Sequence, residues 1–247
     1  MQLLDYGKSV NEWPRARRPH VQPIKTGLKA NPMTDPTLVI GNKTYSSWSL
    51  RAWLALKATG AAFEEAVIPL DRPDTAAAIA AWSEAGKVPV LRHGDLTVWD
   101  SLAIGEYLAE LYPAAGLWPS GRPSRALARS VVCEMHDGFT ALRREMPMDL
   151  GRSYPKTPSE PVAADIARIC RIWEICRRQP SAADGPFLFG DFTLADAFYA
   201  PVASRFITYN VTLSPIARSY VETIMAMPEM RAWYAAAAEE PWVIQDP

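Results

Sequence analysis

The chain has 247 residues, of which 49% are hydrophobic and 21% charged, and its formal net charge is -1. This composition is typical of a globular protein with one large or two small domains, and the balanced charge gives no indication of a nucleic-acid partner. No apolar run approaches the roughly 18 residues that a membrane-spanning helix needs. Three cysteines, without CxxC or zinc-type spacing and without a secretory signal, favour a reducing compartment, so the sequence predicts a cytoplasmic protein without a metal site.

Residues 1–36 differ from the rest of the chain. They contain five prolines and an arginine-rich patch but no hydrophobic periodicity, so they bury too little apolar area to offset the entropy of ordering. We expect a disordered extension here, with the functional protein beginning near Met33. A basic arm that binds nucleic acid is the alternative. N-terminal sequencing of the natively expressed protein that returned residues before Met33 would contradict this start.

From residue 37 to about residue 111, strand-like and helix-like segments alternate. Short apolar runs indicate strands, and longer periodic segments indicate helices. His93-Gly94-Asp95, which lies between two short runs, is typical of a tight hairpin. The resulting β-α-β-α-β-β-α order predicts an α/β layer closed by an antiparallel hairpin. The expected elements are a strand at 38–40, a helix at 48–59, a strand at 63–70, a helix at 73–82, strands at 88–91 and 96–98, and a helix at 102–111.

Residues 113–123 are rich in proline and glycine and are expected to form a linker. Every segment beyond them is predicted to be helical, and Pro201 is expected to kink one of these helices. The sequence therefore predicts a small α/β domain at 37–112 joined to an all-α domain at 124–247. The expected helices of the second domain are 124–146, 161–178, 193–208, 215–227 and 228–239.

Hydroxyl side chains gather at the start of the first predicted helix. Ser46, Ser47 and Ser49, together with Trp48, lie between a strand and that helix. The first turn of a helix leaves N–H groups unpaired, and the helix dipole favours negative charge there. The sequence therefore predicts a small anion site, although capping alone explains each serine taken singly.

Two further groups of residues belong with these serines. Lys87, Val88 and Pro89 place a proline at a strand start, where the bond is often cis and exposes the preceding backbone N–H and C=O to a ligand. Asp100 and Ser101 begin the third helix and make a second anion-receptive terminus. In a β-α-β-α-β-β-α fold all three groups face one edge of the sheet.

A peptide-like ligand fits this edge. Its backbone would pair with Val88, its carboxylate would bind at Ser101, and its ammonium would bind at Asp100. Its thiol would reach Ser46 or Ser47. Three unrelated helix caps do not explain this joint order and spacing.

These motifs resemble the glutathione-binding half of glutathione transferases. The resemblance rests on YSSWSLR at 45–51, KVPVL at 87–91 and WDSLAI at 99–104. In the second half of the chain, FTLADA at 192–197 resembles the helix-capping box of the family. The resemblance covers residues 37 to about 240 and implies a thioredoxin-like α/β domain followed by an all-α helical domain. It also implies a homodimer that uses glutathione as co-substrate in detoxification, with no permanently bound cofactor.

The serine motif is similar to that of the zeta class, in which the first serine is regarded as catalytic. That role would carry over to Ser46, whereas the spacing of the theta class points to Ser47, and both remain candidates. Tyr45 is a third candidate hydroxyl. Trp48 stands where the zeta motif has cysteine, a departure that weakens the case for a zeta-type isomerase but leaves glutathione binding in place. The residues that the resemblance assigns to glutathione are Ser46, Ser47, Trp48, Ser49, Arg51, Lys87, Val88, Pro89, Asp100 and Ser101.

The mechanism that the resemblance implies agrees with elementary chemistry. A cysteine thiol has a pKa of about 8.5 and is mostly protonated at neutral pH. A hydroxyl that donates to the sulfur, near the positive end of a helix, stabilises the thiolate and lowers that pKa. Oxidoreductases on the same scaffold carry CxxC at this position, where Ser46-x-x-Ser49 offers no thiol, so disulfide exchange by that route is excluded.

Two other groups of residues have predicted roles in the helical half. Thr193 as N-cap and Asp196 three residues later are expected to satisfy the first amides of their helix reciprocally, so Asp196→Ala should cost roughly 1 kcal/mol or more. Arg143 or Arg144 is a candidate for attracting an anionic substrate. The expected walls of the electrophile pocket are Trp48, Met135, His136, Phe139 and Arg143.

The leading interpretation is a glutathione S-transferase that activates the thiolate by a serine hydroxyl and acts on small electrophiles. A glutathione-dependent isomerase, dehalogenase or peroxidase would be a variant of this chemistry. The alternative is a non-catalytic interaction or ligand-binding protein on the same fold, like the stringent starvation proteins that bind RNA polymerase. Retention on immobilised glutathione, followed by turnover of an aromatic halide, separates these classes.

Overall fold

The structure is a computed structural model that describes residues 35–244. The predictions for residues 1–34 lie outside the described residues. Within the described range, no helix is both long enough and apolar enough to cross a membrane.

The first half of the described chain forms a four-stranded mixed sheet in the order β2-β1-β3-β4. β1 pairs with β2 in parallel and with β3 in antiparallel, and β3 pairs with β4 in antiparallel. A tight turn at Gly94 joins β3 to β4, and the φ of 58° at this residue lies in the left-handed region that glycine adopts readily. The strands are β1 Thr37–Gly41, β2 Glu64–Ile68, β3 Val90–His93 and β4 Leu96–Trp99.

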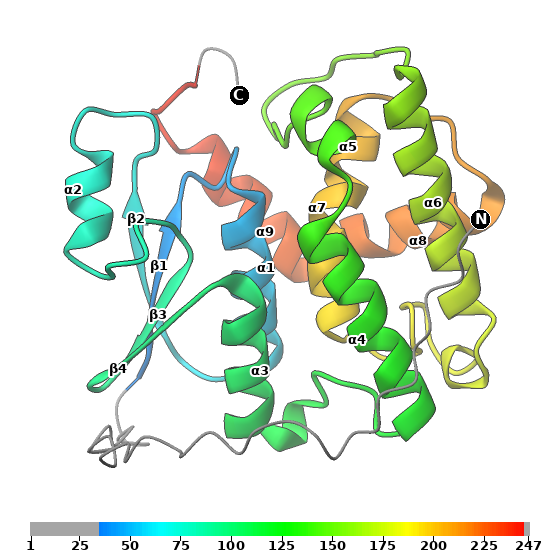
Figure 1. Cartoon of the computed structure of the whole chain (residues 1–247), viewed down its shortest axis with the longest axis horizontal. Coiled ribbons are helices and arrows are strands. Elements are labelled where there is room, and N and C mark those ends of the chain that lie inside the picture. The colour runs from blue at the N-terminus through cyan, green and yellow to red at the C-terminus, as the bar shows by residue number, and fades with distance from the viewer. Residues whose placement is uncertain (1–34, 245–247) are drawn as a thin grey trace, which may run out of the picture.

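Helices cover both faces of this sheet (Figure 1). Successive side chains of a strand point to opposite faces, and the apolar residues Leu38, Val39 and Ile40 bury β1 on both sides. Val39 packs in a small cluster with Ile79 of α2, while Leu38 and Ile40 join the main core with α1 and α3. The helices of this half are α1 Ser47–Ala58, α2 Thr75–Ala80 and α3 Ser101–Leu111. The β-α-β-α-β-β-α order and the thioredoxin-like arrangement predicted from the sequence are confirmed.

The second half of the described chain is helical and packs against α1 and α3 (Figure 1). The core is continuous from the sheet through α1 into α7, so these two helices are buried around almost their whole circumference. The proposed domain limits of 37–112 and 124–247 stay predictions. A short 3₁₀ turn, η1 Pro113–Ala115, follows α3 and a second, η2 Pro180–Ala182, follows α6. The helices are α4 Arg122–Asp137, α5 Thr140–Glu145, α6 Glu160–Arg177, α7 Leu194–Thr208, α8 Pro215–Ala226 and α9 Pro228–Ala238.

The single helix predicted at 124–146 is wrong, because the chain breaks there into α4 and α5. Gly138 ends α4, and Phe139 adopts a left-handed φ of 59° that no helix interior accommodates. The guanidinium of Arg143 in α5 donates to the carbonyl oxygens of Met135, His136 and Gly138 at the end of α4. These bonds satisfy carbonyls that lack intrahelical partners, so the break is stabilised by a residue that lies beyond it.

Candidate functional site

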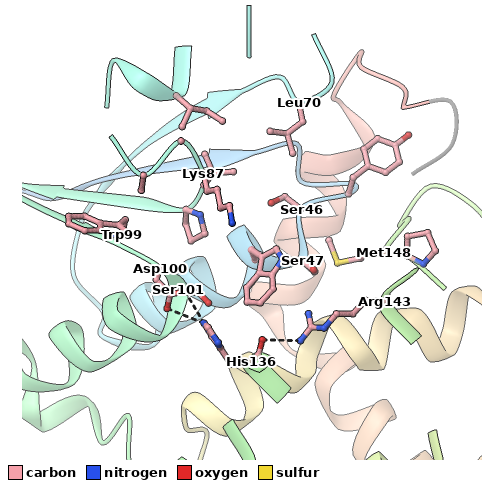
Figure 2. A pocket seen from close by; sticks show the side chains of 18 of the residues that line it. Ser46, Ser47, Leu70, Lys87, Trp99, Asp100, Ser101, His136, Arg143 and Met148 are labelled. Atoms are coloured by element: carbon pink, nitrogen blue, oxygen red, sulfur yellow. Dashed lines mark hydrogen bonds and ion pairs between the residues drawn. The ribbon is translucent and has the colours of Figure 1, made fainter. Parts of the chain in front are cut away.

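One cavity of about 1000 Å³ lies where the N-termini of α1 and α3 face the helical half. It brings together the three groups of residues that the sequence singles out, although they lie far apart along the chain (Figure 2). Its predicted residues are Ser46, Ser47, Trp48, Lys87, Val88, Pro89, Asp100, Ser101, His136 and Arg143. Tyr45, Leu70, Ile79, Ala85, Gly86, Trp99, Pro147, Met148 and Arg205 also line it.

A chain of hydrogen bonds links Gly41 and Ser49 to Ser46, the N-cap of α1. The Gly41 amide donates to Ser49 Oγ at 3.0 Å, and Ser49 Oγ lies 2.7 Å from Ser46 Oγ. Because Ser49 Oγ already accepts from Gly41, its own hydrogen can be given to Ser46. Ser46 Oγ also accepts from the Ser49 amide at 3.3 Å, which leaves its hydrogen available to an anion in the cavity.

Ser47 differs from Ser46 in its partner. Its Oγ accepts from Nη2 of Arg205 in α7 at 3.3 Å, so this hydroxyl belongs to a positively charged part of the cavity. Both serines are nearly buried yet reach the cavity surface.

The loop that leads into α1 is held from the far end of the chain. The carboxylate of Glu240 accepts from the amide of Lys43 at 2.9 Å and from that of Thr44 at 3.4 Å. Trp233 Nε1 of α9 donates to the Lys43 carbonyl at 2.9 Å, and Thr44 Oγ1 donates to the Ala237 carbonyl at 3.3 Å. Helix α9 and Glu240, which follows it, thus hold the residues just before Ser46 in place.

We expect Glu240→Ala to expose the amides of Lys43 and Thr44 to hydrogen exchange and to lower the free energy of unfolding by about 1–3 kcal/mol, because two partly buried donors lose their acceptor. Glu239→Ala is the matched control, since Glu239 is an exposed neighbour with no such bond. Equal protection of the two amides in both variants would show that Glu240 does not hold the loop.

The start of α3 is the second part of the cavity. Asp100 adopts a φ of 73°, and its Oδ1 caps the helix by accepting from the amides of Leu102 at 2.8 Å and Ala103 at 3.4 Å. His136 Nε2 of α4 lies 2.8 Å from the other carboxylate oxygen. A non-glycine residue at positive φ costs on the order of 1–3 kcal/mol, and such strain gathers at functional sites.

Ser101 is an unusual helix residue. Its side chain is 1% exposed, lines the cavity, and its Oγ has no hydrogen-bond partner in the structure. A buried hydroxyl without a partner is unfavourable unless a ligand completes it. The cis Val88–Pro89 bond lines the same cavity as Ser101. The exposed Lys87 immediately precedes Val88 in the chain.

Four predicted residues do not reach the cavity surface. Ser49 and Arg51 are fully buried behind it, and Met135 and Phe139 lie in the core. Arg144 is largely exposed and pairs with Glu145. Of the two candidate arginines, the structure therefore places Arg143 in the cavity.

Arg205 is the lining residue that the sequence prediction missed. It is 4% exposed and donates to the carbonyl oxygens of Met146 at 2.9 Å and Pro201 at 3.2 Å. Burial, together with the charge of Arg143, lowers the pKa of Arg205 to about 9. The available signal was its position in α7, a helix that is apolar all round, where a charged side chain must be buried.

The Thr193–Asp196 pair lies away from the cavity and begins α7. Thr193 Oγ1 accepts from the Ala195 amide at 3.3 Å, and Asp196 Oδ2 accepts from the Thr193 amide at 2.9 Å. Asp196 Oδ1 accepts in addition from the Leu188 amide at 3.0 Å and from the hydroxyl of Tyr220 at 3.1 Å. The pair joins α7 to the preceding loop and to α8.

Comparison with known proteins gives two family matches. The family described as glutathione S-transferase, N-terminal domain, matches residues 45–111, and glutathione S-transferase, C-terminal domain, matches residues 134–236. Among curated proteins, glutathione S-transferase L2, chloroplastic, from Arabidopsis thaliana is 24% identical over 242 residues, which cover 91% of this chain and 74% of the relative.

Solved structures agree with this fold. A glutathione transferase homologue from Burkholderia with bound glutathione is 25% identical, with a TM-score of 0.64, and the match covers 83% of this chain and 99% of that one. Maleyl pyruvate isomerase, a bacterial zeta-class protein, is 23% identical, with a TM-score of 0.63, and the match covers 83% of this chain and 98% of that one. The two family matches lie in the order in which these domains follow one another and span both halves of the described fold, so the chain belongs to the glutathione S-transferase family.

Proposed function

We propose that this protein is a glutathione S-transferase in which the Ser46 hydroxyl stabilises the glutathione thiolate for attack on a small electrophile. The observation that carries the proposal is the single cavity that joins the start of α1, the cis Val88–Pro89 segment and the start of α3. Glutathione needs these three parts: a donor for sulfur, a backbone edge for its peptide groups and a receptor for its γ-glutamyl end. The Burkholderia homologue with bound glutathione supports the same ligand.

In this proposal the γ-glutamyl carboxylate accepts from the unpartnered Ser101 Oγ, and the ammonium lies near Asp100. The peptide groups pair with the backbone of Val88. The cysteine sulfur then lies at the N-terminus of α1, where Ser46 has a hydrogen to donate. The other predicted residues at 47–51 and at Lys87 border the same ligand or support its walls.

The chemistry follows from that position. Glutathione loses its thiol proton to solvent, because the Ser46 hydroxyl and the dipole of α1 favour the thiolate. The sulfur attacks an electrophilic carbon, a C–S bond forms, and the leaving group departs with the electron pair of the bond that breaks. With an aromatic chloride the products are a thioether and chloride. The cavity contributes by holding the two reactants in line.

We prefer Ser46 to Ser47 as the donor because the two hydroxyls have different partners. Ser46 accepts from Ser49, and the hydrogen-bond chain from Gly41 polarises its O–H toward the cavity. Ser47 accepts from Arg205 and so lies on the side of the helical half. We also keep the homodimer and the cytoplasmic location as proposals.

Titration calorimetry with glutathione, followed by turnover of chlorodinitrobenzene, tests this function. We expect saturable binding, and conjugation that depends on enzyme concentration. Absence of glutathione binding would overturn the proposal and favour an interaction protein on the same fold. Binding without turnover of any electrophile would leave a ligand-binding role and would remove the catalytic part of the proposal.

Ser101→Ala is expected to raise the KM and Kd for glutathione by about tenfold or more, because a hydrogen bond to a charged group is worth about 1.5–3 kcal/mol. The same change should leave thermal stability unchanged or slightly higher, since the hydroxyl has no partner within the protein. Ser130→Ala, at an exposed serine of α4 outside the cavity, is the matched control. Unaltered glutathione affinity in Ser101→Ala would contradict the assignment of the γ-glutamyl end to α3.

A further inference from the structure

Three arginine side chains and two aromatic rings form an arginine cluster beside the proposed thiolate position. The guanidinium of Arg51 lies between the rings of Trp48, at 4.3 Å, and Phe198, at 5.0 Å. The guanidinium of Arg143 also contacts the Trp48 ring, at 4.8 Å from the ring centroid. Arg205 completes the cluster through its bond to Ser47.

This cluster has no counter-ion among residues 35–244. None of the three arginines forms an ion pair with a carboxylate in that range. Three carboxylates act on the cluster electrostatically: Asp100 on Arg51, and Asp137 and Asp165 on Arg143. Asp100 is bound to His136 and the α3 amides, Asp165 accepts from the Leu142 amide, and Asp137 is exposed to solvent.

Several guanidinium nitrogens of the cluster also lack a hydrogen-bond partner in the structure. No nitrogen of the Arg51 guanidinium has a hydrogen-bond partner, and Nη1 of Arg143 has none. Burial and mutual repulsion lower the pKa of Arg51, and burial lowers that of Arg143.

Such an arrangement is costly in free energy for the protein on its own. Burying an unpaired charge is strongly unfavourable, and aromatic faces return only about 0.5–2 kcal/mol per contact. Arg143 and Arg205 line the cavity, whereas Arg51 lies behind Trp48 and adds its positive charge from there. An anion that enters the cavity beside Ser47 would therefore meet two guanidinium groups and the field of a third.

The position of the cluster separates this anion from glutathione. Figure 2 shows Arg143 on the opposite side of Ser47 from Lys87 and Leu70, and apart from Asp100 and Ser101, where the peptide is proposed to bind. Pro147 and Met148 supply apolar wall next to Arg143, as a second substrate requires.

We propose that the electrophile of this enzyme carries a carboxylate, which binds Arg143 and Arg205 beside Ser47. This inference rests on the proposed glutathione transfer and names the substrate class for the same cavity. It also gives Trp48 a role, because its ring contacts the guanidinium groups of both Arg51 and Arg143.

Paired substrates test the inference on the unaltered protein. Chlorodinitrobenzoate and chlorodinitrobenzene react with glutathione in the same way, with loss of chloride, but only the first carries a carboxylate. After division by the uncatalysed rate constants, kcat/KM is expected to favour the benzoate by about tenfold or more. A parallel calorimetric titration compares dinitrobenzoate with dinitrobenzamide in the absence of glutathione.

Variants at two adjacent arginines test whether the preference for the benzoate depends on Arg143. Arg143→Met is expected to reduce the benzoate preference, which is the ratio of the two kcat/KM values, by about tenfold, because chlorodinitrobenzene has no carboxylate for this arginine to bind. Arg144→Met is the matched control, because Arg144 is a largely exposed neighbour outside the cavity. Arg143 also supports the end of α4, so thermal melting accompanies each assay, and the titrations of unaltered protein stand if the variant fails to fold.

The outcomes distinguish the inference from the proposed function. Glutathione binding with no preference for the carboxylate would overturn the inference and leave the transferase intact. An equal loss for both substrates in Arg143→Met would also overturn it, because the arginines would then serve the thiolate. Carboxylate preference in the titration without any glutathione binding would support the anion site and overturn the transferase.

Discussion

Ser46→Ala is expected to lower kcat/KM for glutathione conjugation by about a hundredfold, the usual effect of removing one hydrogen-bond donor from an anionic reacting centre. The hydroxyl of Ser46 accepts from the Ser49 amide and can give its own hydrogen to the sulfur, so its loss removes the donor nearest to the proposed sulfur position. The pKa of the bound glutathione thiol should rise toward the free value of about 8.5. Ultraviolet difference absorption of the thiolate, followed against pH, measures this directly.

Two controls separate activation from capping. Ser46 also caps α1, so the variant loses about 1 kcal/mol of stability in addition. Ser214 caps α8 in the same way and lies outside the cavity, so Ser214→Ala should show the stability loss without the kinetic one. Ser47→Ala should retain the low thiol pKa. A normal thiol pKa in Ser47→Ala together with an unaltered one in Ser46→Ala would transfer the catalytic role to Ser47.

Asp196→Ala is expected to lower the free energy of unfolding by about 3 kcal/mol or more, and Tm by about 10 °C. The carboxylate accepts four hydrogen bonds, two of them from Thr193, and the variant leaves the buried amides of Leu188 and Thr193 and the hydroxyl of Tyr220 without an acceptor. Burial raises the pKa of Asp196 to about 6, against the opposing effect of these donors, so the group is ionised at neutral pH. Chemical denaturation at pH 7 gives the difference.

Two control variants separate the hydrogen bonds of Asp196 to Leu188 and Tyr220 from its role in capping α7. Thr193→Ala removes the capping hydroxyl and is expected to cost about 1 kcal/mol. Asp191→Ala changes an exposed aspartate close by and should be neutral. If Asp196→Ala lowered the free energy of unfolding no more than Thr193→Ala, the carboxylate would act as a helix cap alone. Its hydrogen bonds to Leu188 and Tyr220 would then contribute nothing measurable to stability.

The features that the sequence predicts well are local ones. Asp100 and Thr193 cap their helices through atoms two or three residues away, so a short run of letters contains the whole interaction. The hairpin at Gly94 and the order of strands and helices along the first half of the chain follow from turn chemistry and apolar patterning in the same way. The grouping of Ser46, Val88 and Ser101 in one cavity was also predictable, because the α/β topology brings strand ends and helix starts to one edge.

The features that escaped prediction depend on partners distant in sequence. Arg205 reaches Ser47 across 158 positions, and Glu240 reaches Lys43 across 197. The break at Phe139 is different, because Arg143 lies only five to eight positions from the carbonyls that it contacts, but the periodicity of 124–146 shows only an unbroken apolar stripe. Periodicity reports which face of a helix is buried but carries no information on which charged group will lie against it.

The attachment of α9 to the residues before Ser46 sets an order of events during synthesis. A growing chain can pair β1 with β2 and build the sheet long before Trp233 and Glu240 have left the ribosome. The β1–α1 loop acquires these partners only after Trp233 and Glu240 have been synthesised, so a chain cut short ahead of Trp233 lacks the bonds that hold the residues just before Ser46. Loss of a few residues near position 240, by proteolysis or early termination, would therefore release the loop before Ser46 and remove the stability that Glu240 contributes.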